Sequence, residues 1–348
     1  MKRILSLILV IFLLFVLGCS LVAIKPVKSV SVVGTPYILS TFYTDGKFVL
    51  NILALDGDSN PVELNSSNVK IIIDSVVDYY GTKTKGFDVK VVDFQKIVFE
   101  DGDMGLAMLF DGSGSMSSSD PYWLRKDAAT KMIDYLASDR PNSMVGIFDF
   151  AVGYDTLYYF RTLQDFVEVG TNKNLLIAAL DSLANSGATP LYDAMVLGCR
   201  KLERDINSAE YNRVLMTLTD GGDNDSYLLN STAQSVLAEA KAKDVTLINI
   251  AFGDYAYTPD LMMLADSTGG IFVKAQVAED LEDLFYQLGV GTKGAIQKVT
   301  AQFTDTIPPY YSTVYGRVEI YKGVLPVLNV VSATFKMNVI STKSKLGD

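Results

Sequence analysis

The pattern of apolar and polar positions divides the chain into a central segment and two flanking segments. Between residues 104 and 291, short apolar runs alternate with amphipathic stretches, which predicts a doubly wound α/β fold with a mostly parallel sheet. The expected strands are Leu106–Phe110, Met144–Phe150, Leu157–Phe160, Arg213–Leu218, Val245–Ala251 and Ile271–Val273. The expected helices are Tyr122–Leu136, Lys173–Leu183, Pro190–Leu202, Ser231–Ala242, Pro259–Asp266 and Ala278–Leu288.

One connection in this segment is too short for a crossover helix. A parallel crossover needs about a dozen residues or more, and far fewer separate Phe150 from Leu157. We therefore expect the strand that begins at Leu157 to be an antiparallel edge of the sheet.

Both flanking segments, residues 19–103 and 292–348, have a β pattern instead. Their strands are expected at Ser29–Val33, Phe48–Leu55, Val69–Val76, Gly86–Val92 and Lys96–Glu100, then at Ile296–Phe303, Thr313–Tyr321 and Val330–Val339. Three strands alone make a marginal domain. We therefore predict that the flanking segments pair in one all-β sandwich, into which the α/β domain of residues 104–291 is inserted. The turn at Leu55–Val62 resembles one found in bacterial immunoglobulin-like modules, which implies an immunoglobulin-like sandwich.

The N-terminus has the features of a secretory signal. Two cations, Lys2 and Arg3, precede an apolar run from Ile4 to Leu17. Because a membrane-spanning helix needs about 20 apolar residues, a spanning anchor is the less favoured interpretation.

The end of this run, Val16-Leu17-Gly18-Cys19, resembles a bacterial lipobox. The resemblance implies that residues 1–18 are removed as a signal peptide and that Cys19 becomes the lipid-modified first residue. The protein would then be extracytoplasmic and lipid-anchored to the bacterial membrane. Ser20 favours the outer membrane if the cell has one. An ordinary signal peptide with a chance Gly-Cys pair is the alternative.

Composition excludes several kinds of chemistry. The chain has no histidine, so it has no Ser-His-Asp triad and no His-ligated zinc, copper or haem. Its two cysteines, Cys19 and Cys199, are too few for a four-cysteine metal site, and Cys199 is expected to be a small buried residue. A formal charge of −10 without a basic block argues against nucleic-acid binding. Any metal must therefore be held by oxygen ligands.

Such oxygen donors occur in three loops that the predicted topology brings together. Asp111, Ser113 and Ser115 directly follow the first strand, Thr189 precedes a helix, and Asp220 follows the fourth strand. In the common order 3-2-1-4-5-6 the first and fourth strands are neighbours whose connections diverge, and ligands bind beyond their carboxyl ends. We therefore predict that the five side chains face one crevice and hold Mg²⁺ (or Mn²⁺/Ca²⁺).

These residues also have simpler interpretations. Thr189 stands before a proline and is a suitable helix N-cap, and Asp120, also before a proline, is assigned only that role. Asp220 could belong to an ordinary turn. Asp223 and Asp149 are expected near the rim or the surroundings of the site. Tyr122 and Trp123, at the start of the first expected helix, are assigned to ordinary packing.

The segment from Met104 to Gly291 resembles a von Willebrand factor type A (vWA) domain, a Rossmann-like fold, with an intact metal-ion-dependent adhesion site (MIDAS). The resemblance implies direct ligation by Ser113 and Ser115. It implies that Asp111, Thr189 and Asp220 bind directly or through water. It also implies that an acidic side chain of a protein partner takes the sixth position.

We therefore expect a membrane-anchored, extracytoplasmic binding or adhesion protein that captures a protein partner through a Mg²⁺-dependent MIDAS and is not an enzyme. A structural subunit of an envelope assembly, with a permanently occupied metal site, is the alternative. A metal-dependent hydrolase is a third reading, disfavoured because no His, Lys or Glu in these motifs is an evident general base.

Overall fold

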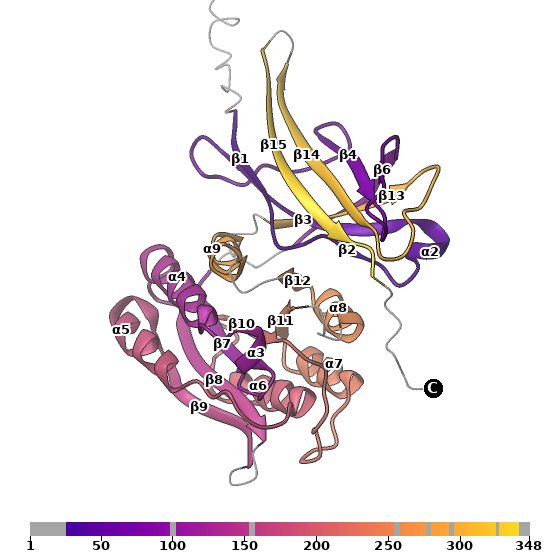
Figure 1. Ribbon diagram of the computed structural model, residues 1–348. Coiled ribbons are helices and arrows are strands. Elements are labelled where there is room, and N and C mark those ends of the chain that lie inside the picture. The colour runs from indigo at the N-terminus through magenta and orange to yellow at the C-terminus, as the bar shows by residue number, and fades with distance from the viewer. Residues whose placement is uncertain are drawn as a thin grey trace, which may run out of the picture.

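The computed structural model describes residues 26–97, 102–152, 157–253, 258–275, 280–291, 296–324 and 327–340 (Figure 1). Cys19 and the expected signal peptide lie outside the described residues. Within these ranges no helix combines the length and the apolar character needed to span a bilayer.

A six-stranded sheet forms the centre of the α/β region. Its order is β12-β11-β10-β7-β8-β9, with β7 (Met104–Asp111), β8 (Met144–Val152), β9 (Leu157–Glu168), β10 (Asn212–Thr219), β11 (Val245–Phe252) and β12 (Ile271–Ala275). Neighbouring strands are parallel except for β8 and β9. The expected strand order and the antiparallel edge are therefore confirmed. The β9 strand is longer than expected, because its pairing with β8 continues through several register shifts.

Helices cover both faces of this sheet. One face carries α4 (Leu124–Asp139), α5 (Val169–Ala179) and α9 (Leu281–Gly291), and the other carries α6 (Leu191–Asp205), α7 (Ala233–Ala242) and α8 (Thr258–Ser267). Shorter turns of helix are α3 (Met116–Ser119) and η1 (Leu180–Ser182). Successive side chains of a strand point to opposite faces, so Leu106 and Met108 enter one core while Ala107 and Leu109 enter the other. This explains why β7 is apolar as far as Phe110.

Two antiparallel sheets form the β region, and each combines strands from before and after the α/β region (Figure 1). The first has the order β1-β3-β13-β6, with β2 also paired to β3; the second has the order β15-β14-β4-β5. Their bounds are β1 (Val27–Val32), β2 (Tyr37–Ile38), β3 (Lys47–Asp56), β4 (Val69–Val77), β5 (Lys83–Thr84), β6 (Val89–Lys96), β13 (Ile296–Phe303), β14 (Thr313–Val324) and β15 (Val327–Asn338). A short helix, α2 (Phe42–Asp45), precedes β3. The immunoglobulin-like character of this region stays a prediction.

The β6 strand corrects one expectation. A strand was expected at Gly86–Val92, but it runs from Val89 to Lys96. Thr300 of β13 pairs with Asp93 and Ala301 pairs with Val91, so Val92 is an extra residue, as in a β-bulge. The bulge interrupts the alternation of side chains, which is why the pattern placed the end of the strand at Val92. The strand expected at Lys96–Glu100 lies mostly outside the described residues.

The β3 strand joins the two regions because both of its faces are covered. Its side chains Leu50 and Ile52 enter the core between the two β sheets, whereas Val49 and Leu53 enter the cores of the α/β region. Where the chain leaves and re-enters the β region, the Ile97 amide donates to the Ile296 carbonyl at 3.2 Å.

The outer edge of β12 is covered by the segment that precedes β2. The Thr35 amide donates to the Lys274 carbonyl at 2.7 Å, and the rings of Tyr37 and Phe272 meet edge to face with centroids 4.9 Å apart. The Asn51 side chain donates to the Phe272 carbonyl at 2.9 Å. An exposed sheet edge invites unwanted pairing, so this contact both protects β12 and attaches the β region.

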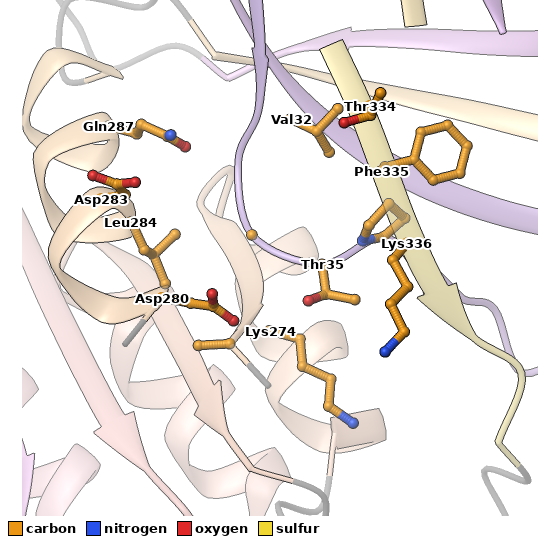
Figure 2. A pocket seen from close by; sticks show the side chains of 13 residues that line it. Val32, Thr35, Lys274, Asp280, Asp283, Leu284, Gln287, Thr334, Phe335 and Lys336 are labelled. Carbon is orange, nitrogen blue, oxygen red and sulfur yellow. The ribbon is translucent and has the colours of Figure 1, made fainter. Parts of the chain in front are cut away.

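A polar cleft of about 370 Å³ opens beside this attachment, between α9, the end of β12 and β15 (Figure 2). Figure 2 shows the carboxylates of Asp280 and Asp283 on the α9 side and the ammonium group of Lys336 on the β15 side. Lys274, at the end of β12, also lines the cleft, so the cleft carries two carboxylates and two ammonium groups.

Candidate metal centre

Main-chain hydrogen bonds hold three loops together at the carboxyl ends of β7 and β10. The Gly114 amide donates to the Gly187 carbonyl at 2.9 Å, and the Ser186 amide donates to the Gly112 carbonyl at 2.8 Å. The loop after β10 joins them where the Asn224 amide donates to the Thr189 carbonyl at 3.1 Å. In Figure 1 this side of the sheet lies at the bottom, away from the β region.

These loops bring four of the five predicted side chains into one hydrogen-bonded group. The hydroxyl oxygens of Ser113 and Ser115 lie 3.0 Å apart, and Ser115 Oγ donates to Asp220 Oδ1 at 2.8 Å. Asp111 Oδ1 accepts from the Ser113 amide at 2.8 Å.

Thr189 lies beside this group. Its amide donates to Asn224 Oδ1 at 2.8 Å. Its hydroxyl oxygen is 4.0 Å from the position that a Cβ would take on Gly221, the residue after Asp220.

The group is buried except at one side. Asp111, Ser113, Thr189 and Asp220 are buried, whereas Ser115 is exposed. Burial raises the pKa of Asp111 to about 6, although hydrogen bonds from Ser113 and Thr219 lower it, and repulsion by Asp220 raises it further. A cation between the two carboxylates would offset both the burial and the repulsion.

The donor set fits a small divalent ion. Mg²⁺ takes octahedral oxygen ligands at about 2.1 Å, which places adjacent ligand oxygens about 3.0 Å apart. The separations of 3.0 Å between the two serine oxygens and 2.8 Å from Ser115 to Asp220 are close to this spacing. No group of three or more His, Cys, Asp or Glu side chains in the described part of the chain is arranged to hold a metal. Neutral hydroxyls are therefore an essential part of this donor set.

Comparison with known proteins identifies the α/β region. The family model of the von Willebrand factor type A domain matches residues 106–287. The chain belongs to this family. The α/β region is thus the type A domain, and its Rossmann-like fold agrees with the expectation from the sequence.

Several solved structures are similar to this chain. A von Willebrand factor type A protein from Catenulispora acidiphila has 10% identity and a TM-score of 0.47, covering 91% of this chain and 75% of that one. Proximal thread matrix protein 1 from the mussel byssus, with a zinc-occupied MIDAS motif, has 18% identity and a TM-score of 0.44, covering 55% and 48%. The pilus adhesin SpaC from Lactobacillus rhamnosus GG, in its open conformation, has 11% identity and a TM-score of 0.44, covering 84% and 45%. A search of curated proteins found no match.

Two hydroxyl residues of the type A domain contact the predicted donors and were missed in the sequence. Ser119 Oγ donates to Asp220 Oδ2 at 2.5 Å, and Thr219 Oγ1 donates to Asp111 Oδ2 at 2.6 Å. Ser119 lies one helical turn after Ser115, the residue that precedes α3, so the two serines face the same side of that helix. A helix of four residues is too short to be predicted from periodicity, so the sequence alone gave no signal for this contact.

Asp149 lies beneath the loops of the type A domain rather than at their rim. Its carboxylate is buried, is paired with the Arg161 guanidinium, and accepts from the Ala184 amide at 3.0 Å. Asp223 instead accepts from the Tyr192 amide at 3.1 Å and from the Ser226 hydroxyl, and burial raises its pKa. Both carboxylates therefore order loops next to the donors.

The expectation that Asp120 is the N-cap of the helix was wrong, because Trp123 holds that position in α4. Asp120 nevertheless binds the first turn of the helix. It accepts from the Leu124 amide at 2.7 Å, and it forms an ion pair of 2.7 Å with Arg125, with both side chains fully buried. Arg125 also donates to the Ala184 carbonyl at 3.1 Å. Ala184 is thus held at its carbonyl by Arg125 and at its amide by Asp149, and both contacts fix the loop that leads to Thr189.

Proposed function

We propose that the type A domain binds Mg²⁺ through an intact MIDAS made of Asp111, Ser113, Ser115, Thr189 and Asp220, and that the ion captures an acidic side chain of a protein partner. Mn²⁺ and Ca²⁺ are the alternative ions. The single observation that carries this proposal is the contact between serine and aspartate oxygens from two separate loops, at separations that suit an octahedral ion.

The charges of the donors favour an acidic partner. Two carboxylates at most neutralise a divalent ion, and the hydroxyls add no formal charge. A carboxylate that contacts the ion only through water leaves the ion electrophilic. Because Ser115 is exposed, an incoming carboxylate can reach the ion from that side.

The ion also makes binding switchable. The protein carries a formal charge of −10, so an acidic partner is repelled by the protein as a whole. Attraction between the protein and an acidic partner would therefore depend on the ion. A chelator that removes the ion would abolish this attraction.

The same protein would act from a membrane surface. Lipid attachment at Cys19, after removal of residues 1–18, would hold it outside the cytoplasm on a bacterial membrane, the outer one if the cell has one. The MIDAS loops lie on the side of the molecule opposite the start of β1 (Figure 1). That arrangement supports the proposal, because the loops would face away from the anchored end.

The binding function is favoured over an enzymatic one by the contacts of the site. The side chains that hydrogen-bond to Asp111, Thr189 and Asp220 within the described part of the chain belong to serine, threonine and asparagine. None of them is a general base at neutral pH. A structural subunit with a permanently bound ion is the second candidate, and reversibility in a chelator separates it from a capture protein.

Partner capture from an envelope extract tests the proposal. The purified protein should retain a partner in Mg²⁺, release it in EDTA, and retain it again when Mg²⁺ is restored. Asp111→Ala should retain nothing. Asp305→Ala, which changes an exposed carboxylate of the β region, should behave as the wild type. Undiminished capture by Asp111→Ala in EDTA would exclude the MIDAS as the capture site.

A further inference from the structure

The loop between β10 and α7 presents large apolar side chains to solvent beside the MIDAS. Tyr227 is 70% exposed, Leu228 is 55% exposed and Leu229 is 37% exposed. Scattered exposed apolar residues are common, but contiguous ones frequently mark an interaction site. Three such residues in succession therefore call for a functional explanation.

This loop is held firmly in place. The buried carboxylate of Asp193, on α6, accepts from the Leu229 amide and from the Ser231 amide, each at 3.0 Å. The Asp193 amide in turn donates to Ser226 Oγ at 3.0 Å, and that hydroxyl donates to Asp223. The apolar side chains are thus ordered before any partner arrives, which lowers the entropic cost of binding.

The loop is also continuous with the MIDAS. Asn224 is bonded to Thr189 through both its amide and its side chain. Three peptide links separate Asn224 from Tyr227, so their Cα atoms are within about 11 Å of each other.

A further aromatic side chain lies on the other side of the site. Tyr122 is 78% exposed, and it follows Ser119, which donates to Asp220. The expectation that Tyr122 is an ordinary packing residue was wrong. Tyr122 precedes α4, which covers one face of the sheet. Tyr227 follows Ser226, which is hydrogen-bonded to α6 on the other face. We call Tyr122, Tyr227, Leu228 and Leu229 the apolar rim.

Acidic side chains accompany the apolar rim. Asp223 and Asp225 belong to the loop of Tyr227, and the chain has an excess of carboxylates. A partner with several acidic residues in a row would be repelled everywhere except at the ion. The rim therefore suits a partner whose acidic residue has uncharged, apolar neighbours.

We infer that the apolar rim selects the partner of the MIDAS, which is a protein segment in which one Asp or Glu is flanked by aromatic or aliphatic residues. This inference rests on the proposed function, since the acidic residue is held by the ion. The ion supplies the point of attachment, and the rim supplies the apolar contacts that distinguish one acidic segment from another.

Selection from a library of random peptides tests the inference without knowledge of the natural partner. The full-length purified protein is exposed to the displayed library in Mg²⁺, and peptides released by EDTA are sequenced. Released peptides should contain an Asp or Glu with apolar residues enriched on its flanks. Peptides with an acidic residue but no such enrichment would overturn the inference and leave the proposed function standing.

Variants of the rim provide the second arm. A selected peptide should bind Tyr227→Ser/Leu228→Ser about tenfold or more weakly than wild type, while the two proteins bind Mg²⁺ equally. Tyr80→Ser is the matched control, because Tyr80 is 88% exposed but lies in the β region, and it should bind as wild type. Equal peptide affinity of the double variant and wild type would contradict the inference.

Two other outcomes have defined meanings. Failure to recover any peptide in a Mg²⁺-dependent manner, or recovery of the same peptides with Asp111→Ala, would overturn the proposed function and the inference with it. Binding to phosphatidylcholine vesicles that the double variant loses would assign the rim to a lipid surface and overturn the inference alone.

Discussion

The candidate metal centre of the type A domain and its junction with the β region are built from different interactions. At the candidate metal centre, buried charged groups are paired through directed hydrogen bonds, as in Asp120 with Arg125 and Asp149 with Arg161. At the junction with the β region, apolar contacts dominate, as between Tyr37 and Phe272.

This difference follows from what each surface has to do. A metal site needs oxygen atoms placed to a fraction of an ångström, and directed hydrogen bonds in a buried network restrict position in this way. An attachment surface needs mainly burial of apolar area, which is not directional. Substitutions of the ion-paired residues that support the first surface should therefore alter both stability and metal affinity, and substitutions at the second surface should alter stability alone.

The largest effect is expected from Arg125→Met. The substitution leaves the Asp120 carboxylate buried without its cation, which should lower the free energy of unfolding by about 3–5 kcal/mol in a denaturant titration. Mg²⁺ affinity of the folded variant should fall as well, because the Ala184 loop loses one of its two contacts.

Lys126→Met is the matched control for this experiment. Lys126 is the next residue and, like Arg125, lies over the Trp123 ring. It forms only a partly exposed ion pair with Asp181. Its loss should cost less than about 1 kcal/mol. Equal costs for the two variants would show that burial of the Asp120 pair does not matter.

Asp149→Asn should have an intermediate effect. It removes the charge opposite Arg161 and weakens the contact with the Ala184 amide, so we expect a loss of about 2 kcal/mol in the free energy of unfolding and weaker Mg²⁺ binding. Asp165→Asn, which changes a more exposed carboxylate paired with Lys201, serves as the control. Unchanged metal affinity in Asp149→Asn would mean that this carboxylate has no positioning role.

Phe272→Leu should have the smallest effect of the three. It removes part of a buried ring at the junction, and we expect a loss of about 1 kcal/mol, below the cost of truncation to alanine. Calorimetric titration should show that Phe272→Leu binds Mg²⁺ with the same affinity as the wild type. A lower affinity in this variant would contradict the distinction between the two surfaces.

Much of the fold could be predicted from the sequence because its pattern is local. Apolar strands that alternate with amphipathic helices indicate a doubly wound α/β fold directly, and the short link after Phe150 indicates the antiparallel edge. The β6 strand was misjudged because the bulge at Val92 shifts the alternation within a single strand. Tyr122 was misjudged because α4 begins only at Leu124, after a left-handed residue at Trp123.

The same distinction applies to the candidate site. The proximity of its residues could be predicted because each has a defined place relative to a strand or a helix; they are Asp111, Ser113, Ser115, Thr189 and Asp220. The contacts that support them were not, because their partners are distant in the sequence. Arg125 meets Ala184, and Asp149 meets Arg161 and Ala184, only once the sheet has formed.

Direct titration with Mg²⁺ tests the central claim most directly. Calorimetry should show one ion bound by the wild type and by Asp305→Ala with the same affinity. Asp220→Ala should bind none, while its circular dichroism and its unfolding transition stay close to those of the wild type. The account would be contradicted if the wild type bound no ion, or if Asp220→Ala bound Mg²⁺ as tightly as the wild type.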